Sequence, residues 1–284
     1  MDVRRIGVLG AGQMGAGIAQ VAARAGYDVV MRDIEARFVE KGMAAIAASL
    51  GKFVEKGKLT GVEKDATLTR IRTTLVVADL AASDVIIEAV VEDRDLKRRV
   101  FAELDALCSP DTIFASNTSS ISITELAAST GRPDRFVGMH FFNPVPLMGL
   151  VEVVRGLGTS DATANAITEL AKSVGKTPVE VRDSPGFASN RILMPFINEA
   201  FVALREGVAA PKDLDTVARL GFNHPMGPLE LADLIGLDTC LAVMEVLHEE
   251  FGDPRYRPAL LLREYVRAGR LGRKSGRGVY EYGR

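Results

Sequence analysis

Residues 6 to 15 read Ile-Gly-Val-Leu-Gly-Ala-Gly-Gln-Met-Gly. The first four form a short apolar run, which is typical of a buried strand, and the next six have the spacing G-x-G-x-x-G. An apolar helical stretch, Met14–Ala25, follows directly. A strand, a glycine loop and a helix in this order predict the first βα unit of an open α/β sheet.

The glycine loop also predicts a ligand. Gly10 allows a tight turn, Gly12 lets a pyrophosphate approach the backbone, and Gly15 lets the helix pack on the strand. The N–H groups at the start of the helix, where Gln13 and Met14 lie, favour phosphate charge. These five residues are therefore candidate contacts of a dinucleotide. The alternative is a glycine turn that serves packing only.

The second apolar run, Asp28–Met31, leads to Asp33, 18 residues after Gly15. A carboxylate at this place can bind both ribose hydroxyls and would repel a 2′-phosphate, which predicts NAD as the cofactor. The neighbouring Arg32 leaves NADP open, because a guanidinium there can accommodate the extra phosphate.

Over the first 180 or so residues, short apolar runs alternate with helical stretches. The expected strands are Ile6–Leu9, Asp28–Met31, Val85–Ala89, Ile113–Ala115, Phe136–His140, Val151–Val154 and Val179–Val181. This alternation predicts an α/β fold with a Rossmann-type, doubly wound sheet. We expect an NAD-binding domain over residues 1–184.

An insertion interrupts the alternation. Apolar residues recur every three or four positions from Val39 to Val54, and a turn at Gly57–Gly61 leads to a second expected helix over Val62–Ile71. We interpret the pair as a helical hairpin. Ser49, Lys52 and Lys56 share one polar face of its first helix. That face is a candidate phosphate contact, or else a solvated charged face.

The segment Arg182–Gly186 contains Pro and Gly after the last expected strand of the sheet and is interpreted as a hinge. After it we expect a smaller all-α domain, residues 185–284, for dimerisation and substrate binding. Pro195 should kink its first helix or limit the first turn. The further expected elements are helices over Lys212–Leu220, Leu229–Glu250 and Ala259–Ala268, and a strand over Val279–Tyr282.

Composition narrows the function. The chain has 284 residues, of which 47% are hydrophobic, and a net charge of -2. This balance argues against nucleic acid and against an anionic membrane surface as partners. Cys108 and Cys240 match no metal spacing, so we expect free thiols, no metal and a reducing cytoplasmic location. No apolar run approaches the roughly 18 residues of a membrane span.

Three histidines are candidates for a base near neutrality: His140, His224 and His248. His248 lies mid-helix beside two glutamates, and His224 lies in a turn, so a solvated face and a capping role explain them. His140 ends an expected strand, at the edge where α/β sheets bind ligands. The alternative for His140 is a hydrogen-bonded core histidine.

A catalytic histidine needs an orienting partner, and Glu152 lies in the next strand among three valines. A buried carboxylate requires a partner, although an ion pair to a lysine remains the alternative. Two more polar sites are Asn117 and Ser119, after the strand at 113–115, and Asn190. Helix caps are the plain interpretation of these.

Five stretches together resemble the 3-hydroxyacyl-CoA dehydrogenase family, in particular its short-chain bacterial members, over essentially the whole chain. They are Gly10–Gly15, Ser116–Ser120, Gly138–Pro144, Asp183–Arg191 and Leu271–Tyr280. The resemblance implies active-site roles for Ser119, His140, Glu152 and Asn190. It also implies cofactor contacts and CoA contacts: Asp33, Glu92, Lys97, Asn143 and Lys274 for NAD, and Ser49 and Lys56 for CoA.

The resemblance further implies reversible, NAD-dependent interconversion of L-3-hydroxyacyl-CoA and 3-oxoacyl-CoA. We expect a short-chain pair, 3-hydroxybutyryl-CoA and acetoacetyl-CoA, in fatty-acid or butanoate metabolism, and a homodimer. Two alternatives stay open from the residues. One is a dehydrogenase of a free hydroxy acid or sugar acid of the gulonate type, and the other is a non-catalytic NAD(H)-binding redox sensor.

Overall fold

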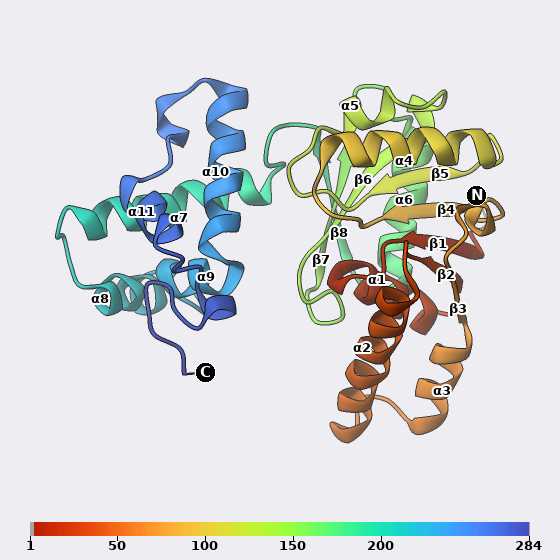
Figure 1. The fold of residues 1–284 in the computed structure, drawn as a ribbon, viewed down its shortest axis with the longest axis horizontal. Coiled ribbons are helices and arrows are strands. Elements are labelled where there is room, and N and C mark those ends of the chain that lie inside the picture. Colours follow the sequence, from red (N-terminus) through yellow and green to blue (C-terminus); the bar gives the residue numbers. More distant parts are fainter. Residues whose placement is uncertain (1–2, 284) are drawn as a thin grey trace. The chain divides into compact units, whose positions relative to one another are not determined.

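The computed structural model describes residues 3–283. The chain divides into two compact units, Met1–Asp183 and Ser184–Arg284 (Figure 1). The expectation of an α/β fold with a Rossmann-type sheet, followed by a helical part, is confirmed.

The N-terminal unit is built on one eight-stranded sheet. Its strands are β1 (Arg5–Leu9), β2 (Asp28–Arg32), β3 (Ile71–Thr74), β4 (Val85–Glu88), β5 (Ile113–Ser116), β6 (Phe136–Phe141), β7 (Leu150–Arg155) and β8 (Thr177–Arg182). They lie in the order β3-β2-β1-β4-β5-β6-β7-β8, and neighbours are parallel except for the antiparallel pair β6–β7. From β1 the chain adds strands toward one edge of the sheet, up to β3, and from β4 it adds strands toward the other edge. Open α/β sheets bind ligands at such a switch point, here between β1 and β4.

Helices cover both faces of this sheet (Figure 1). The helices of this unit are α1 (Gln13–Arg24), α2 (Ala36–Glu55), α3 (Gly61–Thr69), α4 (Arg94–Leu107), α5 (Ile123–Ala127) and α6 (Asp161–Ser173), with 3₁₀ turns at Val77–Leu80 and Pro133–Arg135. Of these, α2 and α3 project from the sheet as a hairpin beside α1 (Figure 1). Ile18 of α1 and Ile167 of α6 belong to the core on one face. On the other face, Phe101 of α4 contacts Phe136 of β6, with ring centroids 4.6 Å apart.

Alternation along the strands supplies both cores. Ile6 and Val8 of β1 face the core that contains α1, whereas Gly7 lies against Leu80 and Ile86 on the opposite side. Successive side chains of a strand point to opposite faces, so a strand covered on both sides must be apolar throughout. Each fully buried aliphatic side chain contributes roughly 1.5–3 kcal/mol.

The expected helical hairpin is present as α2 and α3. Val39, Ile46 and Leu50 of its apolar stripe are buried, and Thr60 and Glu63 form a capping box that begins α3. The expected extent of the second helix is wrong, because α3 ends at Thr69 and the chain continues as β3. Only the parallel pairing with β2 reveals this short, half-polar edge strand.

The C-terminal unit is all-helical. It contains α7 (Ser189–Arg205), α8 (Pro211–Thr216), a π-helical segment (Val217–Gly221), α9 (Pro228–Ile235), α10 (Leu237–Phe251) and α11 (Leu260–Arg267), with 3₁₀ turns at Pro254–Tyr256 and Arg273–Ser275. A separate core joins α7, α9, α10 and α11 around Phe201, Leu229 and Leu247. Helix α7 runs on through Pro195, so this proline does not limit the helix to its first turn.

Three further expectations for this unit are wrong. The single helix expected over Leu229–Glu250 is two helices, because Gly236 with φ 106° ends α9 and begins α10. The helix expected over Lys212–Leu220 is α-helical only to Thr216 and continues as the π-helical segment. Val279–Tyr282 is not a strand, since its backbone N–H groups at 279 and 280 donate to Asp233 instead of to a sheet partner.

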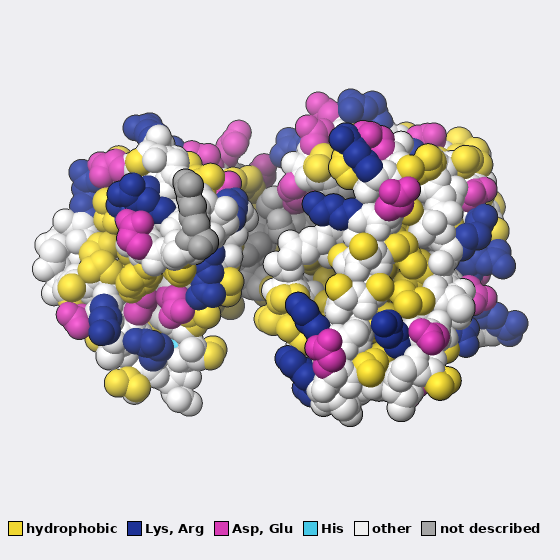
Figure 2. All heavy atoms as spheres, turned by 60° about the horizontal axis from the view of Figure 1, so that its bottom comes forward, with side chains coloured by type: hydrophobic (Ala, Val, Ile, Leu, Met, Phe, Trp, Pro, Cys, Tyr) yellow, Lys and Arg dark blue, Asp and Glu magenta, His cyan; other side chains and the backbone are white. Residues whose placement is uncertain are grey.

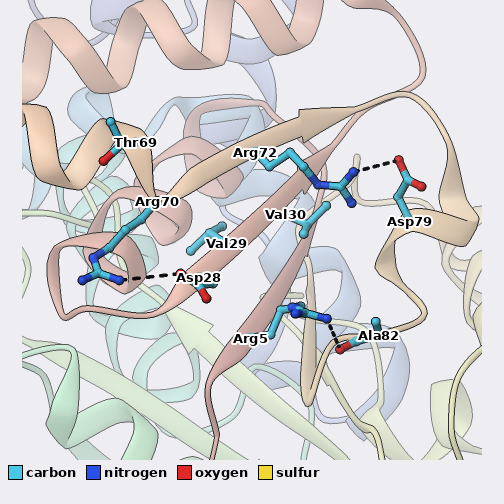
Figure 3. Close-up of a pocket in the computed structure, with 9 residues that line it drawn as sticks. All are labelled: Arg5, Asp28, Val29, Val30, Thr69, Arg70, Arg72, Asp79 and Ala82. Carbon is cyan, nitrogen blue, oxygen red and sulfur yellow. Dashed lines mark hydrogen bonds and ion pairs between the residues drawn. The ribbon is translucent and has the colours of Figure 1, made fainter.

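A pocket of about 430 Å³ lies at the amino ends of β1, β2 and β3, at the opposite end of these strands from the glycine loop (Figure 3). Arg70 is paired with Asp28, Arg72 with Asp79, and Arg5 donates to the carbonyl of Ala82. The guanidinium groups that line this pocket are thus engaged within the protein.

Charges of both signs are interspersed with hydrophobic side chains on the face shown in Figure 2. Over residues 3–283, no helix is both long and apolar enough to cross a membrane.

Candidate active site

The glycine loop connects β1 to α1 with the geometry that its spacing predicts. Gly10 has a φ of 104°, a conformation that other residues rarely adopt. A Cβ on Gly15 would lie 1.9 Å from the carbonyl oxygen of Gly10, so any larger residue would force the helix away from the loop. A Cβ on Gly12 would meet no atom within 4 Å, which leaves the start of the helix open.

The start of α1 fits a diphosphate. No side chain caps the helix, and its first turn, which begins with Gln13 and Met14, holds no acidic residue. The N–H groups at the start of the helix and the helix dipole therefore favour an anion, and the helix's own first turn holds no carboxylate that would compete. Asp33 follows β2, and its Oδ2 accepts a hydrogen bond from the N–H of Ala11 at 2.7 Å. The residues present thus fit a dinucleotide that lies across the ends of β1 and β2.

Arg32, which left NADP open, is engaged elsewhere. Its Nε donates to the carbonyl of Leu75, in the loop after β3, at 3.2 Å. Because the guanidinium of Arg32 is engaged by this carbonyl, Asp33 is the better candidate for the residue that binds the ribose.

His140 and Glu152 form a buried pair. They lie directly opposite each other in the antiparallel register of β6 and β7, and Nδ1 of His140 is 2.8 Å from Oε2 of Glu152. Opposite residues of an antiparallel pair put their side chains on the same face of the sheet. His140 is 7% exposed and Glu152 is 1% exposed, so solvent weakens their interaction little.

The end of β6 is joined to the loop after β5. The N–H of Phe141 donates to Oδ1 of Asn117 at 2.9 Å, and the ring of Phe142 lies 4.7 Å from the imidazole of His140. Asn143 follows as an exposed residue at the start of the turn that leads to β7. The structure therefore brings Asn117 and the His140 strand together at the carboxyl edge of the sheet.

Ser119, Glu92 and Lys97 are also brought together. Glu92 Oε1 accepts from the N–H of Ser119 at 3.0 Å and from Thr118 Oγ1 at 2.5 Å. Lys97 lies 3.3 Å from the other oxygen of Glu92. Burial alone would raise the pKa of Glu92, but Lys97 and the hydrogen bonds from Thr118 and Ser119 hold it below its usual range.

Two buried charged residues of this edge escaped the sequence analysis. Glu88, the last residue of β4, binds Lys97 at 2.5 Å. The sequence around Glu88 did contain a signal of this kind, because a carboxylate that follows three apolar strand residues resembles Glu152 among its valines. Lys176 donates to the carbonyls of Val145 and Met148, in the β6–β7 loop, at 2.6 and 2.8 Å. Burial lowers its pKa, and nothing in the sequence around it indicates this contact.

Ser49, Lys52 and Lys56 lie along α2 and at its end. Ser49 is half-buried, Lys52 is exposed, and Lys56 is the exposed residue at the C-cap. The spacing keeps their side chains on neighbouring turns, at the far end of the helix from Asp33.

The remaining candidates belong to the C-terminal unit. Asn190 lies in the first turn of α7, and its N–H donates to the carbonyl of Gly186 at 3.1 Å. Lys274 lies after α11 and forms an ion pair of 2.6 Å with Asp238 of α10.

Comparison with known proteins agrees with this geometry. Residues 5–184 match the family model for the NAD binding domain of 3-hydroxyacyl-CoA dehydrogenase, and residues 186–282 match the model for its C-terminal domain. A probable 3-hydroxybutyryl-CoA dehydrogenase of Deinococcus radiodurans is 56% identical over 98% of this chain and 100% of the relative. A 3-hydroxybutyryl-CoA dehydrogenase of Bradyrhizobium diazoefficiens is 52% identical over 99% of this chain and 96% of its own.

A solved structure gives the same result. The crystal structure of (S)-3-hydroxybutyryl-CoA dehydrogenase from Ralstonia eutropha superposes with a TM-score of 0.97, at 56% identity, and each chain is covered completely.

The fold, the glycine loop and the His140–Glu152 pair define an NAD-dependent dehydrogenase, an oxidoreductase. More particularly, the chain belongs to the 3-hydroxyacyl-CoA dehydrogenase family. Membership supports an acyl-CoA substrate over the two alternatives, a dehydrogenase of a free hydroxy or sugar acid and a non-catalytic NAD(H) sensor.

Proposed function

We propose that this enzyme interconverts L-3-hydroxybutyryl-CoA and acetoacetyl-CoA, with His140 as the acid and base. The observation that carries the proposal is the buried bond of 2.8 Å between His140 Nδ1 and Glu152 Oε2. A histidine whose Nδ1 is held by a carboxylate has a fixed orientation, and it can exchange a proton through Nε2.

The bound nicotinamide supplies the chemistry of hydride transfer. In the direction of oxidation, His140 takes the proton of the 3-hydroxyl group at Nε2 while C3 loses its hydride, and the C3–O bond becomes a carbonyl. In reduction, His140 returns the proton to the same oxygen. A positioned base of this kind contributes roughly 10²–10⁴-fold to the rate.

Glu152 acts through His140. Its carboxylate holds the ring by Nδ1 and stabilises the imidazolium that exists after proton uptake. We assign Ser119 and Asn190 to the polar groups that hold the reacting oxygen and the thioester carbonyl. The Ser119 backbone is fixed by Glu92, which supports a precise place for this loop.

For the cofactor we propose Gly10, Gly12, Gln13, Met14 and Gly15 around the pyrophosphate and Asp33 at the ribose. Glu92, Lys97, Asn117, Ser119, Asn143 and Lys274 complete the cofactor site. Lys97 is 1% exposed and holds two carboxylates, so it acts largely through the groups that it positions.

For the CoA part of the substrate we propose Ser49, Lys52 and Lys56. The exposed ammonium groups of the two lysines suit phosphate, and Ser49 offers a half-buried hydroxyl on the same helix. The NAD-binding part extends over residues 1–184, and residues 185–284 form the dimerisation and substrate part. A homodimer is supported by exposed apolar residues of the C-terminal unit, among them Ile192, Leu220 and Phe222. The buried free thiols of Cys108 and Cys240 suit a reducing cytoplasm.

One assay tests the proposed reaction. Purified enzyme is mixed with NADH and either acetoacetyl-CoA, free acetoacetate or no substrate, and NADH absorbance is followed. We expect fast loss with acetoacetyl-CoA alone and slower loss when NADPH replaces NADH. Equal rates with free acetoacetate would reject the CoA ester, and no loss with any acyl-CoA from C4 to C16 would reject the function.

A further inference from the structure

The carboxyl end of β4 holds a side chain that the proposed mechanism does not use. Glu88 is fully buried, and three donors surround its carboxylate. They are Nζ of Lys97 at 2.5 Å, Oγ of Ser116 at 2.6 Å and the N–H of Val90 at 2.7 Å. Such a set satisfies the hydrogen-bond acceptors of a carboxylate that water does not reach.

Lys97 extends this contact toward the surface of the site. Its ammonium is 1% exposed and also lies 3.3 Å from Glu92 Oε2, while Glu92 Oε1 holds the N–H of Ser119. Glu88, Lys97 and Glu92 therefore form one connected group, here called the charge triad. It links the end of β4, the start of α4 and the loop after β5 (Figure 1).

The triad is not electrically balanced, because two carboxylates share one ammonium. Its net charge is one negative unit. Glu88 and Lys97 are buried, whereas the side chain of Glu92 is 38% exposed, so water screens this charge in part. Stability alone does not account for it, since apolar residues of similar volume often stabilise a core as well as a buried ion pair does. The negative charge of the triad lies beside Ser119, and it would interact differently with a ligand that is positively charged in one of its states and neutral in the other.

The cofactor has two redox states that differ in charge at one end. The oxidised nicotinamide ring carries a positive charge and the reduced ring carries none, whereas the pyrophosphate is the same in both. A fixed negative charge near the ring therefore changes the relative affinity for the two states. Its effect on the pyrophosphate cancels in the ratio of the two dissociation constants.

We propose that Glu88 is a positioning residue of the cofactor site and that the charge triad favours binding of NAD⁺ relative to NADH. The proposal rests on the proposed function, which places Ser119 and Glu92 at the cofactor. It assigns a role to Glu88 that is distinct from direct contact, because its carboxylate acts through Lys97 and through its charge.

The test uses Glu88→Gln, which keeps the size of the side chain and makes the triad neutral. Dissociation constants for NAD⁺ and NADH are measured by calorimetry, without substrate. We expect Kd for NAD⁺ to rise about fivefold and Kd for NADH to change less than about twofold, from loss of one partly screened unit charge. Glu88→Asp keeps the charge and should leave the ratio of the two constants close to that of the wild type.

A matched control is Asp105→Asn, which removes the charge from another part-buried ion pair of the same unit, Arg132–Asp105 at 2.5 Å. It should lower Tm and leave the ratio unchanged. If Glu88→Gln does not fold, Glu92→Gln removes the same charge from the triad and should shift the ratio in the same direction.

Two results would overturn the proposal: equal weakening of NAD⁺ and NADH by Glu88→Gln, or no change of the ratio in either charge-removing variant. Turnover of acetoacetyl-CoA by the wild type is a separate readout. Its failure would count against the proposed function and not against the charge of the triad.

Discussion

Buried carboxylates in the two units have different kinds of partner. In the N-terminal unit, Glu152 is bonded to the ring of His140. In the C-terminal unit, Asp233 is fully buried and accepts hydrogen bonds from the N–H groups of Val279 and Tyr280 and from the hydroxyl of Tyr282. Both carboxylates are satisfied, as buried charges must be.

The difference lies in whether the partner can change its charge. A histidine can gain and lose a proton near neutral pH, so Glu152 can support chemistry. Backbone amides cannot, and burial together with Asp233 raises the pKa of Tyr282 to about 12. Asp233 therefore fixes the chain end to α9. Burial of a carboxylate does not by itself indicate a catalytic site, whereas a partner of a type that titrates near neutral pH points to one.

The largest expected effect tests the titratable partner itself. His140→Gln retains a polar side chain but cannot act as a base, so kcat should fall about 10³-fold. NADH binding, measured by fluorescence, should stay within about twofold of the wild type, because this residue is not assigned to the cofactor. A kcat within tenfold of the wild type would show that the proton moves elsewhere.

The second-largest expected effect comes from removing the negative charge of the His140–Glu152 pair while keeping the shape of the side chain. In Glu152→Gln the ring can still be held, but the imidazolium loses its carboxylate, so kcat should fall about 10²-fold. Tm serves as the control and should change by only a few degrees. Unchanged kcat in a folded variant would reduce Glu152 to a structural partner, and the contrast with Asp233 would disappear.

The third expected effect comes from the same kind of substitution in the C-terminal unit, where we expect a loss of stability and not of activity. Asp233→Asn puts an amide donor where three donors converge, which should cost the C-terminal unit about 2–3 kcal/mol of its free energy of unfolding. Thermal melts measure the loss. At temperatures where the variant is folded, kcat should remain within about threefold, and a hundredfold loss would place Asp233 in the catalytic machinery.

The smallest expected effect concerns the pH dependence of stability. It involves Glu92, a carboxylate whose charged partner is a lysine. The pKa of Glu92 is lowered below the usual 4.5, since Lys97 and hydrogen bonds outweigh the effect of burial. A lowered pKa in the folded state gives stability that is present above about pH 4.5 and is lost as pH falls through the folded-state value. Tm should therefore decrease less steeply below pH 4.5 in Glu92→Gln than in the wild type. Parallel curves would contradict this contribution.

The sequence indicated much of this molecule because local pattern was sufficient there. The glycine spacing, the apolar strands and the stripe of α2 follow from backbone geometry and from the periods of strands and helices. The pairing of His140 with Glu152 was inferred from two neighbouring strands and is present as a direct bond. Motif resemblance added the family, which the comparisons then established.

The elements that escaped prediction depend on partners far away in the chain. Strand β3 is a strand only because β2 lies beside it, and the end of the chain avoids strand structure because Asp233 takes its N–H groups. The sequence shows a glycine at position 236, where α9 ends, but a glycine inside an apolar helical pattern does not by itself indicate whether the helix ends there.

The sequence by itself thus determined the fold class, the dinucleotide loop and the pairing of His140 with Glu152, because each rests on patterns within short stretches. Tertiary structure alone decided that Lys97 pairs with the buried Glu88 and the more exposed Glu92, and that Lys176 fixes the loop after His140. The physical reason is that burial and electrostatic pairing depend on distances in space, and residues separated along the chain acquire those distances only when the sheet is assembled.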